Sequence, residues 1–288
     1  MSLVVKAPAK INLYLDILKK CDNEYHNVEM IMQTVSLHDT ISVNMSKTKE
    51  VNIFSNHRFS ADIKKNTAYK AAISFFDYTN IENPGLNIKI EKKIPVCAGL
   101  AGGSSDAAAV LVALNQMFST NLSKSDLALI GKKVGADVPF CIFGGTMLAK
   151  GIGTKLLPLT AMPDCYMVLC KPNIYVSTKL AYNKVDEMTL QNSNIIPMLK
   201  AVGNKKLEYI AKNLYNKFEC VLRLNEVFKI KNIMIKNGAM GSSMSGSGPT
   251  VFGIFHEKCL AKNCTIILKK YYRDVFLCTS QKNGCEII

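Results

Sequence analysis

The sequence lacks a long hydrophobic run, and this absence limits where the protein can work. No unbroken apolar stretch reaches the ~18 residues that cross a bilayer as a helix, although hydrophobic residues make up 48% of the 288-residue chain. The first ten residues, MSLVVKAPAK, also lack the apolar core of a signal peptide. Charged residues, at 20%, fit a globular protein with a substantial core. We therefore expect a cytoplasmic protein that does not contact a membrane.

Paired cysteine motifs are absent as well. The chain has ten cysteines, yet none of them forms a C-x-x-C pair. Zinc sites and disulfide frameworks depend on close cysteine spacing or on an exported chain. We expect the cysteines to be reduced, mostly buried thiols, and the sequence assigns no residue as a metal ligand.

A concentrated basic segment is missing even though the formal net charge is +14. The lysines are spread along the chain, often in pairs such as Lys19-Lys20 and Lys132-Lys133. Proteins that bind nucleic acids usually gather such charges on one face or in one block. We therefore expect no nucleic-acid partner, and the lysines fit a solvated surface that could also attract an anionic small molecule.

The common phosphate-binding motifs are absent too. The chain has no G-x-x-x-x-G-K-[ST] loop, no G-x-G-x-x-G fingerprint and no protein-kinase motif set. It does contain Ile94–Met117, in which several glycines and two serines precede apolar residues at helical spacing. A glycine-rich loop that opens a helix can bind anions, because free backbone N–H groups and the positive end of the helix dipole meet there. The stretch predicts a polyphosphate site, unless the glycines form only a helix-entry turn.

This glycine-rich stretch resembles the second motif of the GHMP kinases, the superfamily of galactokinase, homoserine kinase, mevalonate kinase and phosphomevalonate kinase. The motif reads P-x-x-x-G-L-G/A-G-S-S/G-S, and here it begins at Pro95 and includes GLAGGSSDAA. The form GGSSDAA is especially similar to that of the 4-diphosphocytidyl-2-C-methyl-D-erythritol kinases of the non-mevalonate isoprenoid pathway. The resemblance implies ATP and Mg²⁺ as cofactors. The residues implied to bind ATP are Asn66, Pro95, Val96, Ala98, Gly99, Leu100, Ala101, Gly102, Gly103, Ser104 and Ser105.

Two further segments resemble the family around the reacting groups. Pro8–Leu13 reads P-A-K-I-N-L, the form of the first motif in these kinases, and Gly135–Phe140 reads G-A-D-V-P-F. The resemblance implies that Asp137 is the catalytic base, and that Lys10 keeps it charged and stabilises developing negative charge. Asn12 is implied to orient the acceptor. Without the resemblance, Lys10 would be an ordinary surface lysine and Asp137 a turn former.

The substrate-recognition segments of the family can also be located. The family reads D-G-Y-H around the cytosine of the acceptor, and this chain has Tyr25-His26 with Glu24 in place of the glycine. An aromatic face stacks on a base, and an imidazole can hydrogen-bond to its polar edge. The resemblance suggests Tyr175 as a second aromatic residue. The third motif contains Gly246 and Ser247, which are expected to close on the substrate.

The remaining patterns predict mixed helices and strands. Strands are expected at residues 3–18 with a break at the proline, and at 30–35, 39–43, 85–92, 166–171, 251–255 and 275–279. Helices are expected at 67–77 with Asn66 as N-cap, after the glycine-rich loop, at 123–134, through most of 179–236, and at 260–272. Residues 46–66 are expected to be irregular, and 238–250 a loop.

Together, the motifs imply a two-domain α+β GHMP kinase. Residues 1–160 would form an ATP-binding half related to the second domain of ribosomal protein S5, and residues 161–288 a ferredoxin-like GHMP kinase half. The implied reaction transfers the γ-phosphoryl group of ATP to the 2-hydroxyl of a small molecule, the cytidine diphosphate derivative of methylerythritol, in a monomer or weak homodimer. Two alternatives remain: another GHMP kinase of the mevalonate or homoserine type, which Tyr25-His26 disfavours, and an inactive nucleotide-binding regulator, which Lys10 with Asp137 disfavours.

Overall fold

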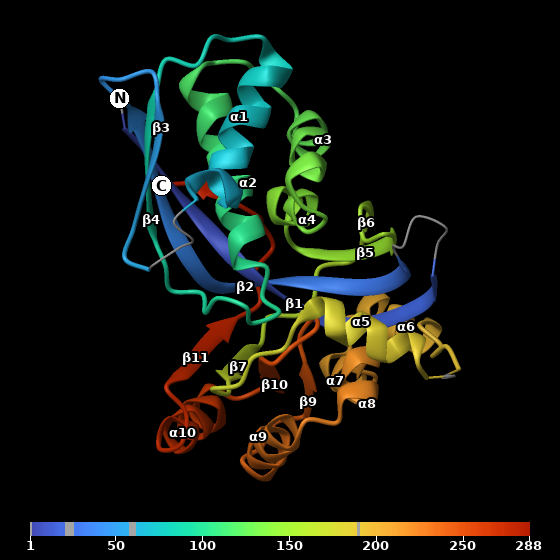
Figure 1. Cartoon of the computed structure of the whole chain (residues 1–288). Coiled ribbons are helices and arrows are strands. Elements are labelled where there is room, and N and C mark those ends of the chain that lie inside the picture. Colours follow the sequence, from blue (N-terminus) through green and yellow to red (C-terminus); the bar gives the residue numbers. More distant parts are fainter. Residues whose placement is uncertain (1, 21–25, 58–61, 189–190) are drawn as a thin grey trace.

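Two long antiparallel strands, β1 (Ser2–Lys20) and β2 (His26–Met45), run through the first sheet (Figure 1). The computed structural model describes residues 2–20, 26–57, 62–188 and 191–288. The pairing of β1 with β2 shifts register between Pro8 and Lys10, where proline has no N–H to give to the ladder. The predicted break is therefore present as an irregularity within one strand. Because β2 is continuous, the prediction of two separate strands at 30–35 and 39–43 is wrong.

Among the residues that the structure describes, six shorter strands complete the first sheet. β4 pairs with β2 and carries β3, β5 pairs with β2 and carries β6, and both β8 and β12 pair with β1. Their bounds are β3 Val51–Ser55, β4 Leu86–Glu91, β5 Thr146–Gly151, β6 Lys155–Pro158, β8 Tyr215–Asn216 and β12 Glu286–Ile287. β3 lies in the segment that was expected to be irregular, because its mixed polar residues give no clear alternation.

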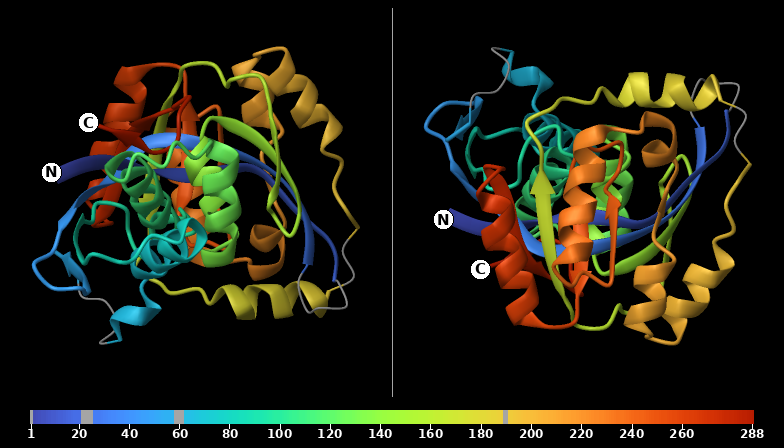
Figure 2. Two further views of the ribbon diagram at one scale, coloured as in Figure 1. Left: turned by 90° about the horizontal axis from the view of Figure 1, so that it is seen from above. Right: turned by 90° about the horizontal axis from the view of Figure 1, so that it is seen from below.

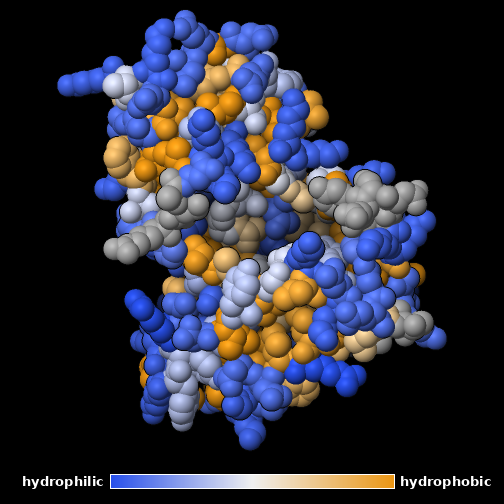
Figure 3. Space-filling view, in the orientation of Figure 1, coloured by the Kyte–Doolittle hydropathy of each residue, from blue (hydrophilic) through white to orange (hydrophobic). Residues whose placement is uncertain are grey.

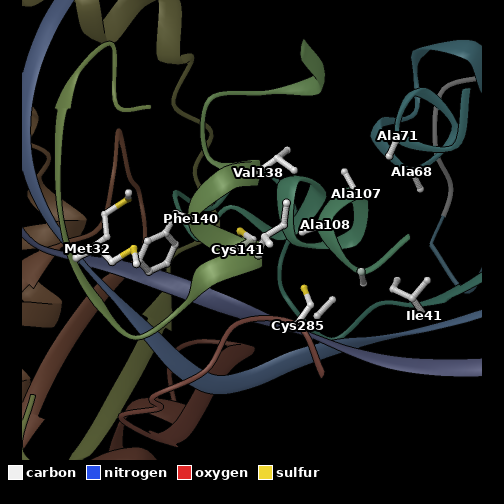
Figure 4. Close-up of a cluster of buried hydrophobic side chains, with 14 of the residues drawn as sticks. Met32, Ile41, Ala68, Ala71, Ala107, Ala108, Val138, Phe140, Cys141 and Cys285 are labelled. Carbon is white, nitrogen blue, oxygen red and sulfur yellow. The ribbon is translucent and has the colours of Figure 1, made fainter. Parts of the chain in front are cut away.

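Helices cover one face of this sheet (Figures 1 and 2). They are α1 Thr67–Thr79, α2 Gly102–Met117, α3 Lys124–Val134 and α4 Val138–Phe143. Figure 4 shows alanines of α1 and α2, among them Ala71 and Ala107, within one buried cluster. Such small side chains let the helices pack closely. The first three helices confirm their predictions, whereas no helix was predicted for the segment of α4.

In the described part of the chain, the second sheet has four antiparallel strands in the order β11-β7-β10-β9. Their bounds are β7 Tyr166–Lys171, β9 Gly241–Met244, β10 Val251–Phe255 and β11 Asp274–Thr279. The helices of this half are α5 Thr178–Asp186, α6 Ile196–Gly203, α7 Leu207–Lys212, α8 Lys217–Leu222, α9 Asn225–Lys236 and α10 Lys258–Lys269. The predicted strands at 166–171, 251–255 and 275–279 are confirmed, and so is the helical character of 179–236.

The two sheets with their helices form the predicted two-domain α+β architecture. The C-terminal half also returns to the first sheet, because β8 and β12 both pair with β1. The boundary at residue 160 stays a prediction. Within the part of the chain that the structure describes, no helix is both long and apolar enough to cross a membrane.

Candidate active site

The glycine-rich loop leads directly into α2, as the sequence predicts. Gly99 has a φ of +75° and Ala101 a φ of +56°, so the chain turns through left-handed conformations before the helix starts. The N–H of Ser105 donates to the carbonyl oxygen of Ala101 at 2.9 Å. The N–H groups of residues 102–104 precede this bond and have no intrahelical acceptor. Together with the helix dipole, they make this end of α2 suited to an anion.

The two serines of the loop have different surroundings. Ser104 borders cavities on both sides of the loop. Ser105 is fully buried, and its Oγ donates to the carbonyl oxygen of Pro8 at 2.7 Å. This geometry therefore does not support the expectation that the Ser105 hydroxyl binds phosphate. Ser105 instead ties α2 to the irregular part of β1 that carries Lys10.

The third motif, around Gly246 and Ser247, lies directly against the glycine-rich loop before α2, which we call the phosphate loop. Ser245 Oγ donates to the carbonyl oxygen of Gly99 at 2.9 Å. A Cβ on Gly99 would lie 2.1 Å from the carbonyl oxygen of Ser245, so only glycine fits this contact. From the other side, Asn216 Nδ2 donates to the carbonyl oxygen of Gly246 at 2.9 Å. Gly246 and Ser247 border a cavity that also reaches the glycine-rich loop, and we call it the main cavity.

Lys10, Asn12 and Asp137 meet where three segments converge. Lys10 Nζ lies 3.7 Å from Asp137 Oδ2 and donates to Asn12 Oδ1 at 2.7 Å. The same Asn12 oxygen accepts a hydrogen bond from the N–H of Gly246 at 3.0 Å. The Lys10 side chain is 5% exposed and that of Asp137 is 32% exposed, so the carboxylate is the more open of the two. Asn12 is fully buried, which gives it the role of holding Lys10 and Gly246 in place.

Lys10 and Asp137 border the main cavity, which has a volume of about 780 Å³, and Figure 3 shows a hollow between the two halves of the molecule. This volume is typical of a small-molecule site. Lys10, Asp137 and the phosphate loop border the cavity from the N-terminal half. Side chains of α5 and the third motif border it from the C-terminal half.

His26, at the start of β2, is buried against α5. Its Nε2 lies 2.6 Å from Asp186 Oδ1, and its ring stacks on Tyr182 with the centroids 4.7 Å apart. Lys20 Nζ lies 3.1 Å from the other oxygen of Asp186. The hydrogen bond with His26, together with Lys20, holds the pKa of Asp186 below its usual value.

Among the described residues, Tyr182 is the aromatic residue that stacks on His26. Tyr175, the residue suggested from the sequence, borders the same cavity but is 73% exposed. Tyr25 lies outside the described residues. Tyr182 could not be singled out from the sequence, because a tyrosine inside a helical stretch usually serves packing. Only the fold reveals that α5 turns it toward β2.

A second cavity, of about 430 Å³, lies on the other side of the phosphate loop. Asn66 borders it at the start of α1, where its Oδ1 accepts from the N–H of Ala68 at 2.9 Å and confirms the predicted N-cap. Pro95 and Val96 also border this cavity. The residues that border both cavities are Cys97, Gly99, Ala101 and Ser104. A nucleotide with its phosphates on the loop could therefore reach from one cavity to the other.

A buried charged cluster supports the loop from behind. Lys92 Nζ lies 2.5 Å from Asp39 Oδ2 and 2.8 Å from Asp106 Oδ2. Burial is the main cause that raises the pKa of Asp106 to about 7, and the nearby Asp39 adds to it, while Lys92 offsets part of the effect. Asp106 Oδ1 is buried and finds no hydrogen-bond partner among the described residues. The sequence predicts this carboxylate in the first turn of the helix after the glycine-rich loop, whereas the structure places Asp106 just beyond that turn. Its partners could not be predicted.

Comparison with known proteins agrees with this geometry. The family of GHMP kinases N terminal domains matches residues 66–145, and the family of GHMP kinases C terminal domains matches residues 198–273. A 4-diphosphocytidyl-2-C-methyl-D-erythritol kinase of Clostridium perfringens is 45% identical over 278 residues, which cover 95% of this chain and 96% of the relative. The protein of the same name from Caldicellulosiruptor bescii is 44% identical, with 96% of this chain and 97% of the relative covered.

Solved structures agree with the sequence relatives. The crystal structure of a 4-(cytidine 5'-diphospho)-2C-methyl-D-erythritol kinase superposes with a TM-score of 0.81 at 29% identity, over 99% of this chain and 100% of the other. A homoserine kinase from Cytophaga hutchinsonii has the same TM-score at 22% identity, over 100% of this chain and 97% of the other, and shares the fold. The chain therefore belongs to the GHMP kinases and, within them, to the 4-diphosphocytidyl-2-C-methyl-D-erythritol kinases.

Proposed function

We propose that Asp137 and Lys10 carry out phosphoryl transfer from ATP to the 2-hydroxyl of 4-diphosphocytidyl-2-C-methyl-D-erythritol in the main cavity. Family membership makes the chain an ATP-using phosphotransferase with an alcohol acceptor, acting in isoprenoid biosynthesis. The proposal adds the roles of individual residues. The observation that carries it is the 3.7 Å approach of Lys10 Nζ to Asp137 Oδ2, beside the phosphate loop and open to the cavity.

The two side chains divide the chemistry between them. A phosphoryl transition state asks mainly for positioning and charge neutralisation. Asp137, which is partly exposed to the cavity, takes the proton from the acceptor hydroxyl as it attacks. Lys10, which is buried and held by Asn12, faces the carboxylate and the developing negative charge. Because Asn12 also accepts a hydrogen bond from Gly246 in the third motif, the position of Lys10 is coupled to the position of that motif.

The phosphates of ATP occupy the start of α2 in this proposal. The backbone N–H groups of residues 102–104 hold them, and Asn66 faces the nucleotide from the second cavity. Mg²⁺ takes oxygen ligands and usually keeps phosphate oxygens and waters among them. The unpartnered Oδ1 of Asp106 fits this chemistry, so Asp106 would supply the protein oxygen, directly or through a water. The ion, when bound, neutralises charge on the phosphates.

The cytidine end of the acceptor occupies the part of the cavity near α5. His26 and Tyr182 offer a polar edge and an aromatic surface there. Tyr175 at the mouth of the cavity is kept as a second aromatic contact, and Tyr25 is assigned from the sequence alone. Lys20 adds positive charge at this end. The expectations of a cytoplasmic monomer or weak homodimer and of no nucleic-acid partner stay predictions.

The test is ATP consumption by the purified chain with Mg²⁺ and each candidate acceptor in turn. We expect turnover with 4-diphosphocytidyl-2-C-methyl-D-erythritol and a fall of about 10²- to 10⁴-fold in kcat for Asp137→Asn. Asp126→Asn is the matched control, because Asp126 is an exposed carboxylate in the capping box of α3, away from both cavities. It should turn over like the unaltered chain.

Other outcomes would favour the alternatives. Turnover of only mevalonate or homoserine would contradict the assignment of the cytidine end to His26. ATP binding without turnover of any acceptor would point to a regulator. Full activity in Asp137→Asn would remove Asp137 from the role of base.

A further inference from the structure

We propose that Asp186 determines specificity for cytosine by fixing the ring proton of His26 on Nε2, which leaves Nδ1 as an acceptor for the exocyclic amine of the base. Asp186 acts here through His26 and is a positioning residue. The inference rests on the proposed function, which brings the cytidine end of the acceptor to His26. It adds the reason why cytosine is preferred to uracil.

The contact between Asp186 and His26 defines which partner donates. Asp186 Oδ1 lies 2.6 Å from Nε2, and the His26 side chain is 6% exposed. Lys20 Nζ, 3.1 Å from Oδ2, favours the charged form of the carboxylate. A charged carboxylate can only accept hydrogen bonds. The proton in this short contact therefore belongs to Nε2.

The aromatic neighbours fix the plane of the imidazole. The His26 ring is stacked on Tyr182 with an interplanar angle of 24°. Tyr182 is in turn held edge-on by Phe218, with the centroids 4.9 Å apart. A ring held by one hydrogen bond and one stacked face cannot exchange its two nitrogens without breaking both contacts. The orientation of His26 is thus set before any ligand arrives.

A neutral imidazole has one donor nitrogen and one acceptor nitrogen. When the imidazole is neutral and gives Nε2–H to Asp186, Nδ1 is the acceptor, and it lies on the side of the ring away from the carboxylate. Cytosine carries an amine donor where the uracil ring carries a carbonyl acceptor. An acceptor nitrogen pairs with the amine and opposes the carbonyl oxygen. A site built around one such hydrogen bond should favour cytidine by about tenfold or more.

The tautomer can be observed directly without substrate. The chain has four histidines, so ¹⁵N-labelled protein gives few imidazole signals, and a His26→Gln variant assigns those of His26. We expect the Nε2–H tautomer in the unaltered chain. In Asp186→Asn the amide can offer either an oxygen or an NH₂ group, so the two tautomers should mix. The control Lys20→Gln removes the other partner of Asp186 and should keep the Nε2–H signal.

Two results of this measurement would overturn the proposal. One is a predominant Nδ1–H tautomer in the unaltered chain. The other is an unchanged tautomer in Asp186→Asn.

Binding of cytidine diphosphate and uridine diphosphate provides the second test. Calorimetric titrations use the full chain with a non-hydrolysable ATP analogue. We expect the unaltered chain to bind cytidine diphosphate at least about tenfold more tightly, and Asp186→Asn to bring the two affinities close together by weakening cytidine diphosphate alone. The affinity for the ATP analogue should not change, because Asp186 borders the main cavity and does not border the second cavity.

The outcomes separate this proposal from the proposed function. Suppose that a folded Asp186→Asn protein loses the same affinity for cytidine diphosphate as for uridine diphosphate. Asp186 would then be a structural residue, and only its role in specificity would be overturned. If the unaltered chain prefers neither diphosphate while its His26 shows the Nε2–H tautomer, the assignment of the cytidine end to His26 fails, and the specificity role falls with it.

Discussion

Asp106 is a single residue that links the stability of the protein to its phosphate loop. One of its oxygens binds Lys92, which Asp39 also shares, and the other oxygen is buried without a partner among the described residues. One ammonium therefore faces two carboxylates in a region that excludes water. Burying a charge without full compensation is costly. Asp106 lies beside the start of α2. We infer that this energetic cost is retained because Asp106 helps to bind ATP and its cation.

The pH dependence of stability should reveal this residue. Burial raises the pKa of Asp106 to about 7, against about 3.9 in an unfolded chain. Between these values the folded state binds the proton more tightly, so the free energy of unfolding should fall as pH rises from about 4 to 7, by at most about 1.4 kcal/mol per pH unit from this group. Asp106→Asn should flatten that fall in urea titrations from pH 5 to 8.

Asp126→Asn is the control for this prediction. The hydrogen bonds from Ser123 hold the pKa of Asp126 below its usual value. Its stabilising contribution is therefore present above about pH 4 and is lost only as pH falls further. The free energy of unfolding that Asp126→Asn removes should consequently be the same at every pH from 5 to 8. A profile for Asp106→Asn that runs parallel to that of the unaltered chain would mean that Asp106 is charged throughout this range.

The residue chemistry shows what a sequence can and cannot predict. The helix that carries Asp106 was predictable because the glycine-rich loop is a local pattern, although Asp106 lies just beyond the first turn and not within it. In the sequence, Lys92 lies 14 positions from Asp106 and 53 positions from Asp39. No local spacing connects them. Likewise, Tyr182 and Asp186 can be identified as neighbours of His26 only when the fold places α5 against it.

At the scale of elements, Asn66 combines a structural role with a proposed binding role. Its Oδ1 caps α1 by accepting from the N–H of Ala68, so we expect Nδ2 to make the contact with ATP. Asn66→Asp should keep the cap and lose the donor, and ATP should then bind more weakly at nearly unchanged stability. Asn66→Ala should lose both, with about 1 kcal/mol of stability. Urea titrations and the KM for ATP measure the two effects separately.

Ser123 supplies the matched cap. It begins α3 with a complete capping box and borders neither of the two cavities. Ser123→Ala should lower the free energy of unfolding by about 1 kcal/mol while the KM for ATP stays constant. Should Asn66→Asp leave the KM for ATP unchanged, Asn66 would be a cap and nothing more.

The elements themselves were predictable where local chemistry defines them. Asn66 and Ser123 marked helix starts because an N-cap satisfies free N–H groups of the same helix. Three strands of the second sheet, β7, β10 and β11, were found because they are short apolar runs. β3 and β9 were missed, since their polar residues pack by pairing with neighbours that are distant in sequence. The unbroken course of β2 also depends on partners, because β1, β4 and β5 all pair with it.

At the scale of the whole molecule, the C-terminal half is joined to the first sheet at several points. β8 and β12 pair with β1, and Val35 forms a bridge with Ser280. Lys217 and Asp16 form a buried ion pair across the two halves, with Nζ and Oδ1 3.3 Å apart. Breaking one partner of a buried pair leaves an uncompensated charge. The halves are therefore expected to depend on each other for stability.

This interlocking predicts that the 288-residue chain unfolds in one cooperative transition. Calorimetric and van't Hoff enthalpies should agree, and circular dichroism and tyrosine fluorescence should give one midpoint in urea. The fragment 1–160 should not fold alone, because it lacks β8, β12 and Lys217 and leaves Asp16 buried without its cation. A cooperative transition of that fragment, or two separate transitions of the full chain, would show that the halves fold independently. In that case the division at residue 160 would mark true folding units, and the strands that return to β1 would only dock two finished domains.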